Sequence, residues 1–252
     1  MLALITPTGA RGAQFEMCRR WMTQQTYQGD VLWVIVDDAL PITTVNVRDD
    51  FRPHWTIDKI FPRPAWMGGN TQARNIKAGV DHLKKNYNSS VIDLIFIIED
   101  DDYYRPVYLE KMIDRKKKYF LIGEMNTIYY NVAVRRHINN NNRKHASLFQ
   151  TAFTWSEIPV LESCYDKKFI DVFLWSRTPQ NKKMLFFDNF LSVGMKGMPG
   201  RGGIGAGHRA GMYFTPDTEM KYLKGLIGED AVHYEHFFNG YNKKSNLFNK
   251  KI

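Results

Sequence analysis

The chain has 252 residues, of which 44% are hydrophobic and 14% aromatic. This composition provides a sizeable core and excludes an intrinsically disordered or low-complexity protein. No apolar run reaches the roughly 20 residues of a membrane-spanning helix, so no transmembrane segment is expected. The formal net charge of +9 predicts an anionic partner such as nucleic acid, a membrane surface or a phosphorylated substrate. A solvated, lysine-rich surface would give the same net charge.

The first hundred residues alternate between buried strands and amphipathic helices. We expect strands at Leu2–Ile5, Val31–Val36 and Leu94–Ile98, because these runs are continuously apolar. Apolar residues at spacings of three and four predict helices at Gln14–Gln25 and Asn70–Lys85. This alternation indicates an α/β fold with a mostly parallel sheet flanked by helices, whose ligands bind where the strands end.

The second half is less regular, and we find no internal repeat or linker in it. The apolar runs there predict further strands, and a proline-initiated amphipathic segment predicts a helix. The expected strands are Tyr119–Ile122, Ile128–Val134, Ser147–Phe153 and Leu185–Phe190, and the expected helix is Thr215–Leu226.

The cysteine content and the first residues of the chain indicate the cellular compartment. Cys18 and Cys164 are too few for a disulfide framework or a cysteine metal site. The start Met1–Ile5 has no basic leader and predicts a strand instead of a signal peptide. We therefore expect an intracellular, reducing compartment, the cytoplasm.

The strongest local signal is the acidic run Glu99–Asp102, which follows the third predicted strand. Adjacent carboxylates repel one another and are costly to desolvate unless a cation is bound. Oxygen ligands of this kind suit Mg²⁺ or Mn²⁺ bridging phosphates. A solvated acidic turn that caps the following helix is the alternative.

Together with the strand before it and the Tyr-x-x-Pro after it, this acidic run resembles the metal motif of GT-A fold glycosyltransferases, especially family-2-like enzymes. The Glu-Asp-Asp form is also similar to that of N-acetylglucosaminyltransferase I. The resemblance implies that Asp101 binds Mn²⁺ or Mg²⁺ with Asp102 beside it. It further implies that Glu99 contacts ribose or metal-bound water and that Asp100 supports the donor site.

Three upstream segments resemble the same family in the required order. They are Leu4–Thr8 with Arg11, Val34–Asp38 and Gly68–Asn75. Taken singly, each also fits an ordinary turn or helix cap. The resemblance implies that these segments hold the nucleotide through Thr6, Pro7, Thr8, Arg11, Asp37, Asp38, Arg74 and Asn75.

Two segments of the second half extend the resemblance. Gly225–Asp230 resembles the family's Glu-Asp motif, which implies Asp230 as general base with Glu229 as its neighbour. His233 or His236 would complete the metal shell, although a zinc pair or packed histidines share this spacing. A helix cap is the alternative for Asp230.

The segment 194–209 is glycine-rich but contains no P-loop signature. Its glycines permit close backbone approach and large motion. With Lys196, Arg201, His208 and Arg209 it is interpreted as a lid over the diphosphate or sugar, and a solvated basic loop is the alternative.

The resemblance implies one GT-A domain, residues 1–252, with a Rossmann-like nucleotide-binding half (1–106) and a smaller acceptor-binding half (107–252) that ends in a basic tail, Lys243–Lys251. The donor would be a nucleotide-sugar, most often a UDP-sugar. Basic stretches interleaved with aromatic residues suit a DNA backbone, so hydroxymethylated DNA bases are one candidate acceptor, as for some phage-type enzymes in the host cytoplasm.

Cell-surface glycans, lipid-linked molecules and proteins are the other acceptors considered. A sugar-phosphate nucleotidyltransferase and a non-catalytic DNA-binding module are the competing functions. The sequence does not indicate an oligomeric state.

Overall fold

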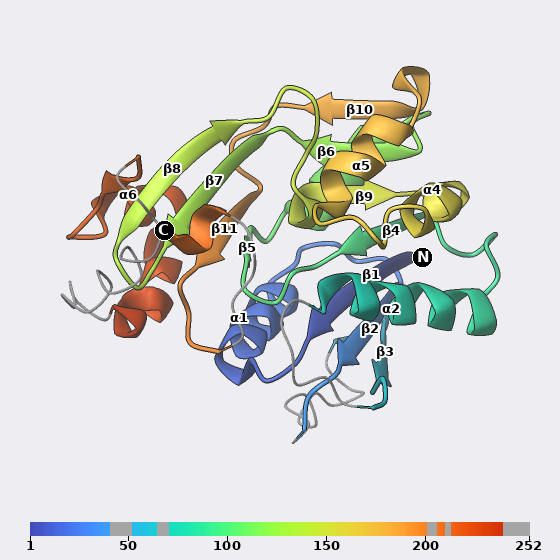
Figure 1. Ribbon diagram of the computed structural model, residues 1–252, viewed down its shortest axis with the longest axis horizontal. Coiled ribbons are helices and arrows are strands. Elements are labelled where there is room, and N and C mark those ends of the chain that lie inside the picture. The colour runs from blue at the N-terminus through green and yellow to red at the C-terminus, as the bar shows by residue number, and fades with distance from the viewer. Residues whose placement is uncertain (41–51, 65–70, 201–205, 210–212, 239–252) are drawn as a thin grey trace, which may run out of the picture.

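The computed structural model describes residues 1–40, 52–64, 71–200, 206–209 and 213–238, and a seven-stranded sheet forms its centre (Figure 1). The strand order is β10-β6-β9-β4-β1-β2-β3. β9 runs antiparallel to β4 and β6, and the other neighbouring pairs are parallel. The strands are β1 (Leu2–Thr8), β2 (Val31–Asp37), β3 (Trp55–Ile60), β4 (Leu94–Ile97), β6 (Leu121–Glu124), β9 (Thr151–Phe153) and β10 (Lys183–Phe186).

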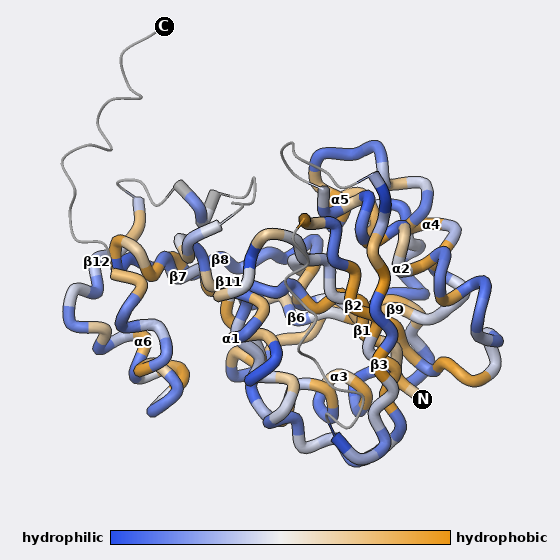
Figure 2. Tube along the Cα trace, turned by 90° about the horizontal axis from the view of Figure 1, so that it is seen from below, coloured by the Kyte–Doolittle hydropathy of each residue, from blue (hydrophilic) through white to orange (hydrophobic). Residues whose placement is uncertain are grey.

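Helices cover both faces of this sheet, as Figure 2 shows from a second direction. Successive side chains of a strand point to opposite faces, so Leu4 packs in the cluster with α1 and α3, and Ile5 packs with α2, α4 and α5. In α2, Ile76, Val80 and Leu83 recur at helical spacing and form its buried face. The helices are α1 (Gly12–Thr23), α2 (Gln72–Asn86), α3 (Tyr108–Lys116), α4 (Ile158–Glu162) and α5 (Ile170–Arg177).

A second sheet of five strands adjoins the first, in the order β12-β8-β7-β11-β5. β7 and β8 form an antiparallel hairpin, and β11 joins β7 to β5. Because β5 follows the acidic run directly, its pairing with β11 brings the end of β11 to that run. The strands are β5 (Tyr103–Tyr104), β7 (Asn126–Asn131), β8 (Arg136–Asn141), β11 (Ser192–Lys196) and β12 (Thr215–Pro216).

The two sheets share one buried cluster, which includes Leu4 of β1, Tyr130 of β7 and Leu223 of α6. The C-terminal segment η5 packs against α1, where the Trp21 indole N–H donates to the Tyr234 hydroxyl over 2.9 Å. The remaining helices are α6 (Lys221–Ile227) and the 3₁₀ segments η1 (Leu148–Gln150), η2 (Trp155–Glu157), η3 (Gln180–Lys182), η4 (Ala206–Arg209) and η5 (Gly228–Phe237).

The structure confirms the α/β fold with a mostly parallel central sheet, including the first three predicted strands. It also contains a helix at each position predicted in the first half, although Asn70 lies outside the described residues. In the part of the chain that the structure describes, no helix is both long and apolar enough to span a membrane.

The expectations for the second half were less accurate. The helix predicted at Thr215–Leu226 is wrong in its first turn, because Thr215 and Pro216 pair with β8 and the helix begins only at Lys221. Ser147–Phe153 is a 3₁₀ turn before a short strand, and the strand predicted at Leu185–Phe190 ends at Phe186. The elements that the sequence did not predict include β3, β8, β11 and α5.

Candidate functional site

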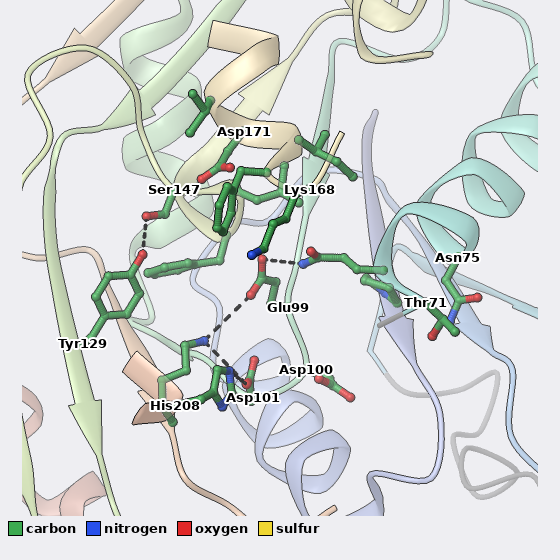
Figure 3. Close-up of a pocket in the computed structure, with 18 of the residues that line it drawn as sticks. Thr71, Asn75, Glu99, Asp100, Asp101, Tyr129, Ser147, Lys168, Asp171 and His208 are labelled. Carbon is green, nitrogen blue, oxygen red and sulfur yellow. Dashed lines mark hydrogen bonds and ion pairs between the residues drawn. The ribbon is translucent and has the colours of Figure 1, made fainter. Parts of the chain in front are cut away.

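A cavity of about 430 Å³ opens where β1 and β4 end, between the two sheets. This volume lies within the range of small-molecule sites. Figure 3 shows Asn75 and Thr71 on one side of the cavity and Tyr129, Ser147 and Asp171 on the other. We call the first side the donor wall and the second the acceptor wall, after the roles that we propose for them below, and the acidic run lies between them.

The donor wall is built on the turn after β1. Pro7, Thr8 and Arg11, for which the sequence predicts nucleotide contacts, line the cavity here. The hydroxyl of Thr8 donates to Asp100 Oδ2 over 2.6 Å, and Asn75 Nδ2 donates to the carbonyl oxygen of Thr8 over 3.1 Å. Asn75 Oδ1 is buried and accepts no hydrogen bond within the described residues, so it is available to a ligand donor group.

Arg11 connects this turn to the acidic run. Its guanidinium nitrogens lie 3.1 Å from Asp100 Oδ1 and 2.8 Å from Asp101 Oδ2. Burial works against the Arg11 charge, but Asp100 and Asp101 outweigh it and raise its pKa. A fixed cation therefore lies beside the acids, at the N-terminus of α1, where anions bind favourably.

The four acids of the run have different environments. Glu99 accepts from Gln72 Nε2 over 2.8 Å and faces the cavity with Asp100 and Asp101. Asp102 is fully buried behind them and accepts from the backbone N–H of Met195 over 2.9 Å. Asp102 thus joins the run to β11 and contributes less to the cavity surface than its neighbours.

Lys196, at the end of β11, lies inside the acidic run. Its ammonium nitrogen is 2.7 Å from Asp102 Oδ1, 3.5 Å from Asp101 Oδ2 and 3.9 Å from Glu99 Oε2. The sequence predicts Lys196 to be part of a lid. Its pairing with Asn131 of β7 instead places it on strand β11, 94 residues along the chain from Asp102.

Burial and neighbouring charges shift the pKa values of these acids in different directions. Burial raises the pKa of Glu99 to about 7 and that of Asp100 to about 6, against the opposing effects of Lys196 and Arg11. Burial also acts on Asp101, but Lys196, Arg11 and His208 together lower its pKa. Asp101 is consequently more strongly ionised at neutral pH than Glu99 or Asp100.

These residues fit a divalent cation by the chemistry of their donors. Within the described residues, Glu99, Asp101 and Asp102 offer ligand oxygens that all lie within 4.8 Å of one another. The Nε2 atom of His208 lies 4.0 Å from Asp101 Oδ2, and burial lowers its pKa to about 4, so the imidazole is neutral and able to bind a metal. Carboxylates with one imidazole suit Mn²⁺ and Mg²⁺.

The histidines and acids predicted in η5 do not line this cavity. Asp230 accepts a hydrogen bond from the Tyr103 hydroxyl over 3.0 Å, and Glu229 is exposed. The His233 ring lies 6.0 Å from that of Trp21, and His236 lies against Phe237. The reason is that η5 buries its apolar face on α1, which places its polar side chains away from the cavity.

Four other predicted nucleotide contacts lie outside the cavity lining. Thr6 is buried on the α1 side of the sheet and accepts from the Trp33 indole N–H over 2.9 Å. Asp37 and Asp38 end β2, where Asp37 accepts from the backbone of Ala39. Arg74 donates to the carbonyl oxygen of Pro64 over 2.7 Å. Gly68–Asn70, Arg201 and the basic tail lie outside the described residues.

The acceptor wall contains a carboxylate that the sequence interpretation missed. Asp171, in the first turn of α5, lines the cavity and acts electrostatically on Glu99. Burial raises its pKa, while backbone hydrogen bonds and His145 oppose that effect. Tyr129 and Phe149 form the nearby aromatic surface, and the Tyr129 hydroxyl is 2.8 Å from that of Ser147.

Comparison with solved structures identifies the fold. S. aureus TarS matches with a TM-score of 0.54 and 11% sequence identity, over 77% of this chain and 36% of that one. The fragment TarS 1–349 in complex with UDP-GlcNAc matches with a TM-score of 0.53 and 11% identity, over 80% of this chain and 60% of that one. The chain has a glycosyltransferase fold.

The same fragment in complex with UDP matches with a TM-score of 0.54 over 77% of this chain. The chain thus spans 36% of the first TarS chain and 60% of the fragment. No protein-family model and no curated protein sequence matches the chain.

Proposed function

We propose that the chain is a glycosyltransferase that moves a sugar from a UDP donor to an acceptor hydroxyl, using Mn²⁺ or Mg²⁺. The observation that carries the proposal is the cavity at the strand ends, where Arg11 and the acidic run lie with Asn75, whose buried Oδ1 accepts no hydrogen bond from the described residues. Two structures with the same fold were solved with UDP and UDP-GlcNAc.

The donor wall supplies the groups that a nucleoside diphosphate needs. Pro7, Thr8 and Asn75 offer a turn and an amide for the nucleoside. Arg11 and Lys196 are cations next to the cavity and suit the diphosphate. Asp101 and Glu99, with His208, would hold the divalent cation, which supplies Lewis-acid stabilisation of the leaving diphosphate when bound.

Asp171 is the carboxylate best placed to activate the acceptor. In the proposed step it takes the proton of the acceptor hydroxyl, and the oxygen forms a bond to the anomeric carbon. The bond from that carbon to the diphosphate oxygen breaks, and the electron pair leaves with the UDP. A single displacement of this kind inverts the anomeric centre. Asp230, the base predicted from sequence, lies outside the cavity lining.

The rim of the acceptor wall supports an acceptor with flat rings and phosphates. Lys168 and Phe169 line the cavity, and Phe169 is 44% exposed. The Lys168 ammonium lies 5.4 Å from the Phe169 ring centre. Exposed aromatic rings with adjacent cations bind single-stranded or extruded bases. We therefore propose hydroxymethylated DNA bases as the acceptor.

A donor and acceptor panel tests this function. UDP-sugars and other nucleotide-sugars are incubated with Mn²⁺ or Mg²⁺, with and without hydroxymethylated DNA, and nucleotide release is measured. We expect release from a UDP-sugar that the DNA stimulates, and its loss in the Asp101→Asn variant.

The other outcomes separate the competing functions. Stimulation by an anionic glycan, a lipid-linked molecule or a protein, but not by DNA, keeps the transferase and replaces the acceptor. Pyrophosphate release from UTP and a sugar 1-phosphate would identify a nucleotidyltransferase. DNA binding that persists in Asp101→Asn, with no nucleotide release from any donor, would favour a DNA-binding module.

A further inference from the structure

The side chain of Lys196 is placed where a cation bound by the acidic run would be. Its ammonium nitrogen lies within 4.0 Å of Glu99, Asp101 and Asp102, the same three acids whose oxygens form the candidate metal site. Only 6% of this side chain is exposed. A positive charge so close to those oxygens repels a divalent ion and occupies its space.

The backbone around Lys196 is held in place, whereas its four-carbon stem is flexible. The N–H of Met195 donates to Asp102, and Gly197 has a φ of +84°, which favours glycine. Lys196 itself lines the cavity, so its long stem allows the ammonium group to turn from the acids toward a ligand there.

One oxygen of the cluster has no partner even with Lys196 in place. Within the described residues, Arg11 and Lys196 are the cations paired with the run. Asp102 Oδ2 is buried and accepts no hydrogen bond within the same residues. A divalent ion would bind the oxygens of the run once the ammonium group withdraws and gains another anionic partner.

We infer that Lys196 is an internal competitor for the metal site, which makes metal binding dependent on the nucleotide diphosphate. Without nucleotide, the ammonium group is paired with the acids and divalent metal binds weakly. When a diphosphate enters the cavity, Lys196 pairs with it and the acids become available to the metal. By thermodynamic reciprocity, the metal strengthens nucleotide binding by the same factor.

Mn²⁺ titrations followed by electron paramagnetic resonance test this coupling on the full chain. For the wild type, we expect UDP to tighten Mn²⁺ binding at least tenfold, after correction for the Mn²⁺–UDP complex in solution. In Lys196→Met, Mn²⁺ alone should bind at least tenfold more tightly than to the wild type, and the UDP effect should shrink. Lys196→Arg retains the charge and should keep the weak metal binding of the wild type.

Two results would overturn the inference. One is a folded Lys196→Met protein, checked by thermal unfolding, that binds Mn²⁺ no more tightly than the wild type. The other is a wild type that binds UDP but whose Mn²⁺ affinity is unaffected by it, a result that needs no variant. The inference rests on the proposed UDP donor, but the two proposals can fail separately. Absence of UDP binding would refute the proposed donor. The comparison of Mn²⁺ binding by the wild type and Lys196→Met without UDP tests the role of Lys196 itself.

Discussion

The two walls of the cavity differ in how the chain builds them. The donor wall comes from the turn after β1 and the start of α2. The acidic run beside it follows β4, and all of these segments lie within the first 102 residues. The acceptor wall is assembled from β7, the segment around Phe149 and the start of α5, which lie in different parts of the second half. Strand ends of one parallel sheet meet at a single edge, so the donor wall follows from local order, whereas the acceptor wall depends on long-range packing.

The walls also differ in charge. On the donor side, buried acids are paired with cations, as Asp101 is with Arg11 and Lys196. On the acceptor side, Asp171 is a partly buried acid for which no ion pair is formed within the described residues, and burial raises its pKa. A paired acid stays ionised and binds cations, whereas an unpaired, desolvated acid is suited to take up a proton.

The acceptor-side acid gives the largest predicted effect. Asp171→Asn should lower kcat by about 10²–10⁴-fold, the usual contribution of a general base, while UDP binding is unchanged. Because the base must be deprotonated and its pKa is raised, wild-type activity should fall on acidification at a pH above the ordinary aspartate value of 3.8. Asp171→Asn should lose the contribution of Asp171 to this acidic limb, whereas Glu99, whose pKa burial raises to about 7, should keep its own contribution. A steady-state pH profile of kcat measures both effects.

Asp230→Asn is the matched control for that prediction. Its carboxylate is bonded to the Tyr103 hydroxyl outside the cavity, so this variant should keep the wild-type pH profile. Normal activity in Asp171→Asn with loss in Asp230→Asn would return the role of base to Asp230.

A donor-side cation gives the next largest effect. Arg11→Met should weaken UDP binding by about 10–100-fold, because hydrogen bonds to a charged group contribute roughly 1.5–3 kcal/mol. Arg74→Met removes an arginine that lies outside the cavity lining and should leave UDP affinity within about twofold. Isothermal titration calorimetry compares the two variants, and equal losses in both would argue against the Arg11 site.

The rim of the acceptor wall gives the smallest effect. Phe169→Ala should raise the KM for the DNA acceptor by about fivefold, because stacking on a base contributes on the order of 1 kcal/mol. The KM for the UDP-sugar should not change. Val232→Ala, an exposed apolar residue on η5, is the control. An unchanged acceptor KM in Phe169→Ala would remove the rim from the acceptor site.

The sequence predicted the donor wall better than the acceptor wall for a physical reason. Apolar strands followed at once by polar residues, as at Thr8 and Glu99, can be recognised from neighbouring residues alone. Nothing local distinguishes Asp171 from any acid in a helical first turn, and the exposed Val172 and Phe173 obscure the amphipathic pattern of α5. The Glu229–Asp230 pair has the more suggestive pattern, but its position is decided by the packing of η5 on α1.

Lys196 illustrates the same limit. Its place in a glycine-rich segment suggested a mobile lid, and only the pairing of β11 with β5 places it against Asp102. The signal that could have found it is the buried strand Ser192–Lys196 before the glycines, which ends in a single cation.

A crystal structure of the chain with UDP and Mn²⁺ tests the central claim most directly. We predict nucleotide density along the donor wall beside Pro7 and Asn75, with the diphosphate between Arg11 and the acidic run. An anomalous manganese signal should lie within bonding distance of Asp101, with the Lys196 ammonium group turned toward the diphosphate. UDP bound elsewhere, or a cavity that stays empty at saturating UDP and Mn²⁺, would contradict the assignment of this cavity as a nucleotide-sugar site.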